Sequence, residues 1–211
     1  MKNPHKTITK EPLRLLLKQR RAAISPELRQ QKSREIAANV CRATWWKNAQ
    51  TVHIYCSFGT EVMTETLRDE ALRLQKRVIV PIAEADKPIL RHAEIFSATR
   101  FIADAWGIPL PTAESSVACN PLHIMSAEDC VIVPLLGFDA NRHRLGYGRG
   151  YYDRFLGSFY GNTSSKPLYV GLAFAETQYV AEGLPIETTD VPLDGIVTEQ
   201  GFFGLPEVFG A

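Results

Sequence analysis

The 211-residue sequence lacks long apolar runs, paired cysteines and any large excess of charge. No stretch approaches the roughly 18 consecutive apolar residues of a membrane-spanning helix. The four cysteines are scattered, with no C-x-x-C pair and no histidine at metal-ligand spacing, which argues against structural zinc. With 24 basic and 23 acidic residues the formal net charge is +1, so no overall field recruits nucleic acid or membrane. An anionic ligand would need a local cluster of positive groups.

The composition is that of an ordinary soluble globular protein, with 45% hydrophobic and 22% charged residues. This length suits one core, so we expect residues 1–211 to form a single domain. The first ten residues are polar and lack the apolar core of a signal peptide. Together with the unpaired cysteines, this predicts a cytoplasmic protein with reduced thiols. We expect a monomer that binds neither nucleic acid nor membrane.

Two helices are predicted at the start of the chain. Apolar residues at helical spacing indicate the first over residues 10–24, with Thr9 as its N-cap. Ser25 and Pro26 are typical of the start of a second helix, whose apolar face ends near Cys41. We expect the Trp45-Trp46 pair to pack this second helix onto the core.

Strands and helices alternate in the rest of the chain. Residue patterns predict helices at 64–75 and 151–159, and strands at 51–56, 77–81, 89–95, 130–134, 168–172 and 196–197. We expect Pro81 to end its strand and 106–111 to be a loop. The strand, helix, strand order is typical of a parallel sheet with right-handed crossovers. We therefore predict an α/β fold of three layers, a mostly parallel sheet with helices on both faces, with a helical N-terminus.

A glycine-rich segment follows the apolar strand at 130–134 and leads into a predicted helix. Glycines at 146, 148 and 150 let backbone amides turn toward one point and let a bulky anion approach without meeting Cβ atoms. The helix start adds unpaired N–H groups and a positive dipole end. Arg144 and Arg149 supply full charges in a geometry suited to phosphate oxygens. A polyphosphate site is predicted, although ordinary turn chemistry also explains three glycines.

The same segment resembles a family signature. Leu-Gly-Phe-Asp at 136–139, followed by Arg-Leu-Gly-Tyr-Gly-Arg-Gly-Tyr-Tyr-Asp-Arg at 144–154, closely resembles the signature of the 5-formyltetrahydrofolate cyclo-ligase family. The resemblance spans nearly the whole chain, with further matches at 10–14, 57–64, 106–109 and 190–194. One departure is Arg142, where the family usually has glycine. We expect the neighbouring Asn141 to accept the left-handed turn.

This resemblance implies an ATP- and Mg²⁺-dependent enzyme that cyclises 5-formyltetrahydrofolate to 5,10-methenyltetrahydrofolate. The formyl oxygen would attack the γ-phosphorus, and nitrogen 10 would then displace phosphate from the phosphorylated intermediate. The implied ATP-binding residues are Lys10, Arg14, Arg144, Gly146, Gly148, Arg149, Gly150, Tyr151, Tyr152 and Asp153. Of these, the implied catalytic cations are Lys10, Arg144 and Arg149. The implied Mg²⁺ ligands are Asp153 and Asp190. Basic residues four apart, such as Lys10 and Arg14, are also typical of a solvated helix face.

The implied substrate pocket for the reduced folate comprises Cys56, Glu61, Trp106, Tyr151 and Tyr152. An acid such as Glu61 suits the hydrogen-bond donors of a pterin, and it follows a predicted strand where open α/β sheets place ligand-contacting groups. Aromatic side chains suit the walls of a flat heterocycle's pocket, although they are core residues more often. We interpret Cys56 as a small packing residue.

Two other classes of function stay open at this point. A non-enzymatic nucleotide-sensing module would use the same loop without a folate pocket. A sugar-phosphate isomerase or coenzyme A transferase would use the same kind of sheet, because fold alone does not fix function. These enzymes need a catalytic acid placed for enediol or thioester chemistry, and no acid in the sequence has that distinctive context. The histidines at 53, 92, 123 and 143 show no triad or metal spacing, and we assign them no catalytic role.

Overall fold

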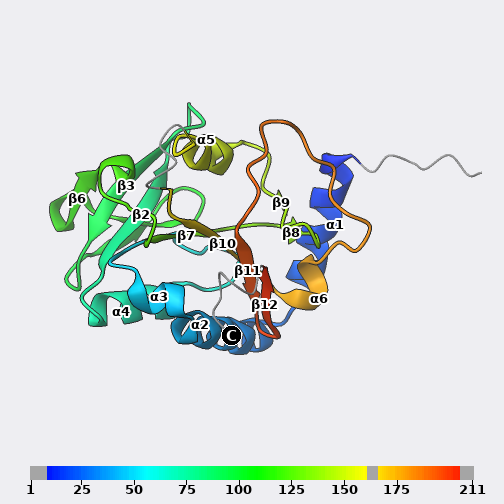
Figure 1. Ribbon diagram of the computed structural model, residues 1–211, viewed down its shortest axis with the longest axis horizontal. Helices are drawn as coiled ribbons and strands as arrows, with labels where there is room; N and C mark the ends of the chain where they lie inside the picture. The colour runs from blue at the N-terminus through cyan, green and yellow to red at the C-terminus, as the bar shows by residue number, and fades with distance from the viewer. Residues whose placement is uncertain (1–8, 161–165, 205–211) are drawn as a thin grey trace, which may run out of the picture.

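The computed structural model describes residues 9–160 and 166–204, so the polar N-terminal stretch at 1–8 lies outside the described residues. Eight strands form the main sheet, in the order β12-β11-β10-β7-β1-β2-β3-β6 (Figure 1). Their bounds are β1 Thr51–Ile54, β2 Arg77–Ala83, β3 Leu90–Ile95, β6 Ser116–Cys119, β7 Cys130–Val133, β10 Leu168–Leu172, β11 Gly195–Thr198 and β12 Gly201–Gly204. Two small ribbons pair β4 (Phe101–Ala103) with β5 (Pro109–Pro111) and β8 (Gly137–Phe138) with β9 (Arg144–Leu145).

The sheet is parallel at its centre and antiparallel at its margins. Strands β2, β1, β7, β10 and β11 are joined by parallel pairings. β12 joins one edge and β3 followed by β6 the other, each by antiparallel pairing. The predicted mostly parallel sheet is confirmed, and its parallel part has all its carboxyl ends at one edge.

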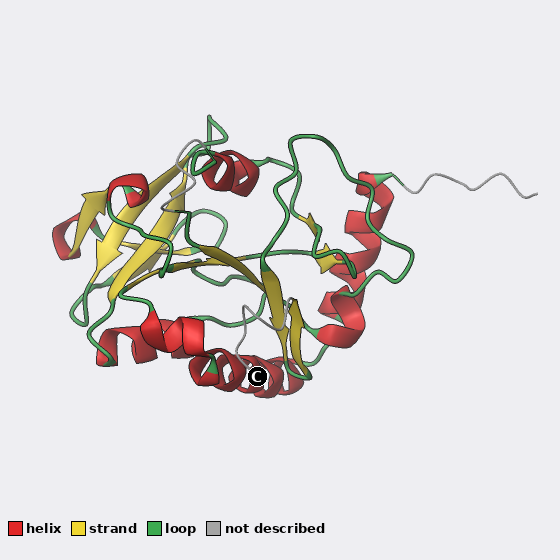
Figure 2. Cartoon of the chain, viewed as in Figure 1, coloured by secondary structure: helices red, strands yellow, loops and turns green. Residues whose placement is uncertain are grey.

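Helices lie on both faces of this sheet. Their bounds are α1 Lys10–Ala22, α2 Pro26–Arg42, α3 Thr44–Asn48, α4 Glu65–Arg73, α5 Tyr151–Gly157 and α6 Ala175–Gln178, with short 3-10 helices at Ala113–Ser115 and Pro121–His123. Figures 1 and 2 show α2, α3 and α4 along one face, α5 on the other, and α1 with α6 at one end of the sheet. The three-layer prediction with a helical N-terminus is confirmed. None of the helices in the described ranges combines the length and apolar character needed to cross a bilayer.

Alternating side chains on the central strands form two cores. In β7, Cys130 and Ile132 pack toward the face covered by α2, α3 and α4, whereas Val131 and Val133 pack toward α5. Trp46 is fully buried in the first core, beside Trp45, so the predicted packing of this pair is confirmed. A β-strand that is covered on both faces has a continuous run of apolar residues. The sequence of β7 therefore predicted a central place in the sheet.

Helix α1 is attached to the glycine-rich segment rather than to the sheet. Its Leu13 and Leu17 share a small core with Leu136, which precedes β8, and Leu145, which belongs to β9. A Cβ added at Gly137 would lie 2.6 Å from Leu17 Cδ1, so this close approach requires glycine. The packing fixes the basic residues of α1 beside the glycine loop.

Two predictions about the strands were wrong. β2 continues through Pro81 to Ala83, because β1 pairs with β2 only as far as Ile79 and no hydrogen bond is needed from residue 81 on that side. Part of the expected loop at 106–111 forms β5, whose prolines have the extended backbone that suits a short ribbon with β4. At the first helix, Thr9 has the expected extended N-cap backbone but makes no side-chain capping bond.

The prediction of which residue is left-handed in the β8–β9 turn was also wrong. Arg142 itself has φ +65°, and Asn141 does not have a positive φ. The Asp139 carboxylate accepts hydrogen bonds from the backbone N–H groups of Asn141 and His143, which fixes the turn on both sides of Arg142. Backbone N–H of Leu193 donates to the Arg142 carbonyl. The left-handed conformation therefore falls at Arg142, the position where the sequence resemblance implies a glycine.

Candidate active site

A cleft of about 1460 Å³ opens where the parallel strands end. Its walls come from the segments that follow β1 and β7, the end of β2, the start of α1, the glycine loop with α5, and residues 187–191. Every site residue predicted from the sequence lines this one cleft. The carboxyl edge of an open parallel sheet is where ligands bind in α/β proteins.

The glycine loop forms one end of the cleft and is braced by α1. Arg14 Nε donates a hydrogen bond to the Gly146 carbonyl at 2.9 Å, and a Cβ added at Gly148 would lie 3.2 Å from Arg14 Cζ. Gly148 has φ +102°, and Gly150, at the N-cap of α5, has φ +68°. Both glycines therefore adopt left-handed backbone that side chains disfavour. We call this part of the cleft the phosphate end, after the polyphosphate site that the sequence predicts here.

Basic side chains at the phosphate end are already paired with acids. Lys10 Nζ lies 2.7 Å from Asp190 Oδ2 and 3.0 Å from Glu187 Oε1. Burial lowers the pKa of Lys10, but its hydrogen bonds to Asp190 and Glu187 more than offset this, so the pKa lies above its ordinary value. Arg14 similarly pairs with Glu11. These cations are charged and held in place by neighbouring carboxylates.

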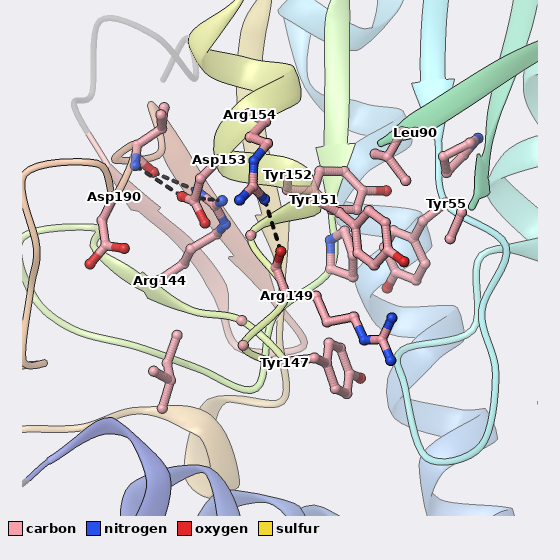
Figure 3. A pocket seen from close by; sticks show the side chains of 18 of the residues that line it. Tyr55, Leu90, Arg144, Tyr147, Arg149, Tyr151, Tyr152, Asp153, Arg154 and Asp190 are labelled. Atoms are coloured by element: carbon pink, nitrogen blue, oxygen red, sulfur yellow. Dashed lines mark hydrogen bonds and ion pairs between the residues drawn. The ribbon is translucent and has the colours of Figure 1, made fainter. Parts of the chain in front are cut away.

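Arg144 and Asp153 form the most enclosed of these pairs. Arg144 Nη2 lies 2.6 Å from Asp153 Oδ1, and its Nη1 donates to the Val191 carbonyl at 2.5 Å. The N–H of Val191 also donates to Asp153 Oδ1. Figure 3 shows this pair with Asp190 on one side of the view and the tyrosines on the other. The guanidinium is thus held between α5 and the segment before β11.

Arg149 occupies a different environment from the other predicted cations. Its side chain is exposed, and Nη1 donates to the Ala85 carbonyl at 3.0 Å, in the segment that follows β2. Arg154 Nη1 donates to the Arg149 carbonyl at 2.9 Å (Figure 3). Arg149 is therefore tethered loosely enough to turn toward a ligand, because an exposed hydrogen bond is easily exchanged for water.

A second part of the cleft, which we call the folate end after the substrate that the sequence resemblance implies, centres on Glu61. This side chain is buried, and its carboxylate accepts hydrogen bonds from the Phe58 N–H at 3.1 Å and the Tyr147 hydroxyl at 2.5 Å. Burial raises the pKa of Glu61 to about 7, although the hydrogen bond from Tyr147 and the charge of Arg21 oppose the shift. Cys56 lies nearby, and burial raises the pKa of its thiol to about 11, so it stays protonated at neutral pH.

Aromatic side chains complete the folate end. The Tyr152 hydroxyl is buried without a hydrogen-bond partner in the described part of the chain, and burial raises its pKa, so it remains a donor. An unpaired buried hydroxyl is costly and suits a ligand acceptor. Tyr151 donates to the Glu84 carbonyl at 2.5 Å. Trp106, at the turn between β4 and β5, is 50% exposed and lines the mouth of the cleft.

Comparison with known proteins identifies the family. Residues 6–199 match the model of the 5-formyltetrahydrofolate cyclo-ligase family. The chain belongs to this family. It is 26% identical over 194 residues to a probable 5-formyltetrahydrofolate cyclo-ligase of Caenorhabditis elegans, covering 90% of this chain and 92% of the relative. It is 28% identical over 183 residues to 5-formyltetrahydrofolate cyclo-ligase of Escherichia coli K12, covering 87% and 96%.

A solved structure supports the same assignment. The NMR structure of Aquifex aeolicus 5,10-methenyltetrahydrofolate synthetase is 29% identical in sequence, has a TM-score of 0.75, and covers 94% of this chain and 93% of that one. Its fold confirms the central sheet with flanking helices. The chain is therefore an enzyme of this cyclo-ligase family, which confirms the resemblance seen in the sequence and decides against the nucleotide-sensing, isomerase and transferase alternatives.

The acids of the cyclo-ligase cleft suit a metal ion that arrives with phosphate. Within residues 9–160 and 166–204, no group of three or more His, Cys, Asp or Glu side chains is arranged to hold a metal. Both hydrogen bonds of Asp153 within these residues fall on Oδ1, so Oδ2 has no donor among them. Both oxygens of Asp190 bond to Lys10. Mg²⁺ is usually held by one or two carboxylates plus substrate phosphates, and these two acids fit that pattern.

Among the lining residues that were not predicted as site residues, three have side chains suited to polar contacts, namely Tyr55, Tyr147 and Arg154. Tyr147 and Arg154 lie inside the glycine-rich signature, and Tyr55 directly follows β1. Arg154 packs under the loop, where a Cβ added at Gly150 would lie 2.9 Å from its Nη1. The position of Tyr147 between two loop glycines was a signal in the sequence, but its contact with Glu61, 86 residues away, was not.

Proposed function

We propose that this chain catalyses the ATP- and Mg²⁺-dependent cyclisation of 5-formyltetrahydrofolate to 5,10-methenyltetrahydrofolate, with release of ADP and phosphate. The observation that carries the proposal is that the phosphate end and the folate end face one continuous cleft. At about 1460 Å³ this cleft exceeds the roughly 300–1,000 Å³ of a typical single-ligand pocket. A site of this size suits two substrates bound together better than a nucleotide alone.

In this proposal, the phosphate end binds the nucleotide by exchanging one set of ion pairs for another. Lys10, Arg14 and Arg144 have carboxylate partners in the structure, and phosphate oxygens would compete with those partners for the same donors. Lys10 would then move toward phosphate and free Asp190, which with Asp153 would hold Mg²⁺. The bound Mg²⁺ would neutralise phosphate charge and orient the terminal phosphoryl group.

The folate end would bind the pteridine by hydrogen bonds. Each oxygen of the Glu61 carboxylate has one protein donor, which leaves further lone pairs for N–H groups of the ring system. The Tyr152 hydroxyl is a donor with no hydrogen-bond partner among residues 9–160 and 166–204. Trp106 and Tyr151 would cover the faces of the heterocycle, and Cys56 would pack against it as a neutral thiol.

Between the two ends, alignment of the substrates would drive the reaction. An amide oxygen is a poor leaving group until it is phosphorylated. The formyl oxygen therefore first attacks the γ-phosphorus of ATP, and ADP leaves. Nitrogen 10 then attacks the activated carbon and closes the ring, and departure of phosphate, with loss of the proton of nitrogen 10, gives the methenyl product. Phosphoryl transfer needs positioning and charge neutralisation, and Lys10, Arg144 and Arg149 are the cations proposed to stabilise the transferred charge. Arg149 would turn from Ala85 to do so.

Absorbance of the methenyl product tests the proposal. Purified protein incubated with 5-formyltetrahydrofolate is expected to form this product only when both ATP and Mg²⁺ are present. One ADP should appear per methenyl product. Product formation without ATP, or ATP-bound protein that gives no product, would contradict the proposal. The monomeric state and the cytoplasmic location expected from the sequence stay predictions.

A further inference from the structure

Arg21, in the last turn of α1, is a buried cation to which the proposed reaction gives no role. Its side chain is 4% exposed, and it has no carboxylate at ion-pair distance among the described residues. Each of its three guanidinium nitrogens instead donates one hydrogen bond to a neutral group. Nε donates to Thr60 Oγ1 at 3.0 Å, Nη1 to the Leu135 carbonyl at 3.2 Å, and Nη2 to the Tyr147 hydroxyl at 2.8 Å. Burying a charge without a direct ionic partner is unfavourable, so its position calls for an explanation.

Tyr147 connects this cation to the folate end. Its hydroxyl accepts the hydrogen bond from Arg21 and donates its own proton to Glu61 Oε1 at 2.5 Å. Its ring is held by Phe58, with centroids 6.0 Å apart, and by Arg21, whose Cζ lies 5.6 Å from the ring centroid. Burial raises the pKa of Tyr147 above its ordinary value, so the phenol remains protonated as the donor. The three side chains form a chain of hydrogen bonds that runs in one direction, from guanidinium to carboxylate.

Such a chain strengthens its last bond. A hydrogen bond from a cation to the phenol oxygen polarises the phenol O–H and makes it a better donor to the carboxylate, especially in a site with little water. The remaining contact of Glu61, from the Phe58 N–H, falls on the other oxygen. The carboxylate is thereby fixed in rotation, with its unused lone pairs directed away from both donors.

We propose that Arg21 and Tyr147 are positioning residues that hold the Glu61 carboxylate in the orientation and charge state required to bind the reduced pteridine. This inference rests on the proposed function, in which Glu61 contacts the folate. Arg21 acts through Tyr147 and through its charge, and neither its own atoms nor those of Thr60 need to touch the substrate.

The electrostatics around Glu61 agree with this arrangement. Burial alone would protonate the carboxyl at neutral pH, and the opposing influences of Tyr147, Arg21 and the Phe58 N–H keep its pKa at about 7. The other titratable groups coupled to it are Tyr55, Tyr152 and Cys56, whose pKa values are all raised by burial. These three groups stay neutral near pH 7, so Arg21 is the charge that favours ionised Glu61.

The first test is the variant Tyr147→Phe, which removes the hydroxyl and keeps the ring against Phe58. We expect the pKa of Glu61 to rise, so the acid limb of kcat/KM for 5-formyltetrahydrofolate should move up by about one pH unit. At pH 7 the KM for the folate should rise by about fivefold, because the ionised fraction of Glu61 falls from about one half to about one tenth, and the KM for ATP should stay within about twofold of wild type. The difference from wild type should shrink above pH 9, where Glu61 ionises in both proteins.

The second test separates positioning from general damage to α1. Arg21→Gln should shift the acid limb in the same direction, and Arg21→Lys should recover part of the shift because it restores the charge. Arg20→Gln is the matched control, since Arg20 is the exposed neighbour on the same helix. Thermal unfolding midpoints identify any variant that fails to fold. If Arg21→Gln does not fold, Tyr147→Phe decides the inference alone.

The outcomes distinguish the inference from the function on which it rests. A Tyr147→Phe enzyme whose acid limb stays in place, with equal loss of activity at every pH, would overturn the positioning role while leaving the cyclo-ligase function intact. Absence of methenyl product in the wild-type protein would instead contradict the proposed function, and the inference with it.

Discussion

The two ends of the cleft are built on different physical principles. At the phosphate end, Lys10 pairs with Asp190 and Arg144 with Asp153, so charges of both signs lie at the surface of the cleft in close pairs. At the folate end, Glu61 is buried among groups that are neutral near pH 7, with Arg21 as the nearby charge. Ion pairs can be exchanged for phosphate and metal at small net cost, whereas a buried carboxylate is expensive to ionise and sensitive to each of its donors.

Because of this difference, the two ends should respond differently to the mutation of their residues. In the proposed reaction, loss of a cation at the phosphate end would remove charge stabilisation from the transferred phosphoryl group and should lower kcat. Loss of a contact at the folate end should alter the pH dependence and the KM for the folate, because it changes the ionisation and orientation of one carboxylate. The variants below test that separation.

The largest effect is expected for Arg144→Ala. It removes a guanidinium proposed to stabilise the transferred phosphoryl group, and kcat should fall by about 10²–10³-fold. Because Arg144 also bonds to Asp153 and the Val191 carbonyl, the thermal midpoint should be measured alongside the steady-state rate. Arg34→Ala, at an exposed position of α2, is the control for loss of an arginine. An Arg144→Ala enzyme with normal kcat would refute its assigned role.

Glu61→Gln should have the next largest effect and should act on a different parameter. The amide keeps the size of the side chain and removes its charge, so kcat/KM for the folate should fall by about 10- to 100-fold. In the wild type, activity should decline as pH falls through about 7, because Glu61 becomes protonated. That acid limb should be absent in the variant. A full pH profile checks both expectations, and an unchanged limb in the variant would show that another group titrates there.

Asp153→Asn should affect the metal requirement. The side chain loses the charge proposed to hold Mg²⁺ beside the phosphates, so the Mg²⁺ concentration for half-maximal rate should rise by at least about tenfold. The KM for the folate at saturating Mg²⁺ should change little, since Asp153 lies at the phosphate end. Titration of Mg²⁺ at fixed ATP measures the effect. A larger change for the folate than for Mg²⁺ would contradict the separation of the two ends.

Arg142→Gly should have the smallest effect and lies outside both ends. Arg142 has φ +65°, a conformation that costs a residue with a side chain about 1 kcal/mol and costs glycine almost nothing. The free energy of unfolding should therefore rise by up to about 1 kcal/mol, less what is lost with the long hydrogen bond from Arg142 Nε to the Leu193 carbonyl. Urea unfolding measures this gain. A destabilised variant would mean that the side-chain contacts outweigh the backbone strain.

Much of the scaffold was predictable because its signals are local. The apolar run of β7 and the helical spacing of α1 and α2 marked the elements, and the glycine loop marked the phosphate end. The continuation of strand β2 through Pro81 was not predicted, because it depends on where β1 stops pairing with β2, which is a tertiary property. The left-handed residue was placed at Asn141 instead of Arg142 because residue preference outweighed the hydrogen bonds of Asp139.

The folate end was less predictable for a physical reason. Glu61 could be proposed from its place after a strand, but its altered pKa depends on burial and on partners distant in sequence. The links from Arg21 to Tyr147 and from Tyr147 to Glu61 join residues 126 and 86 positions apart. A sequence pattern predicts the helix, strand or loop in which a side chain lies. The contacts of that side chain with distant residues follow only from tertiary packing, here the packing of α1 on the glycine loop.

The most direct test of the account is transfer of the formyl oxygen. The cleft is proposed to align that oxygen with the γ-phosphorus of ATP, so the oxygen should leave the folate as part of the released phosphate. We predict that 5-formyltetrahydrofolate labelled with ¹⁸O in the formyl group yields inorganic phosphate that carries one ¹⁸O per methenyl product, measured by mass spectrometry. Unlabelled phosphate formed together with methenyl product would contradict direct attack of the formyl oxygen on ATP.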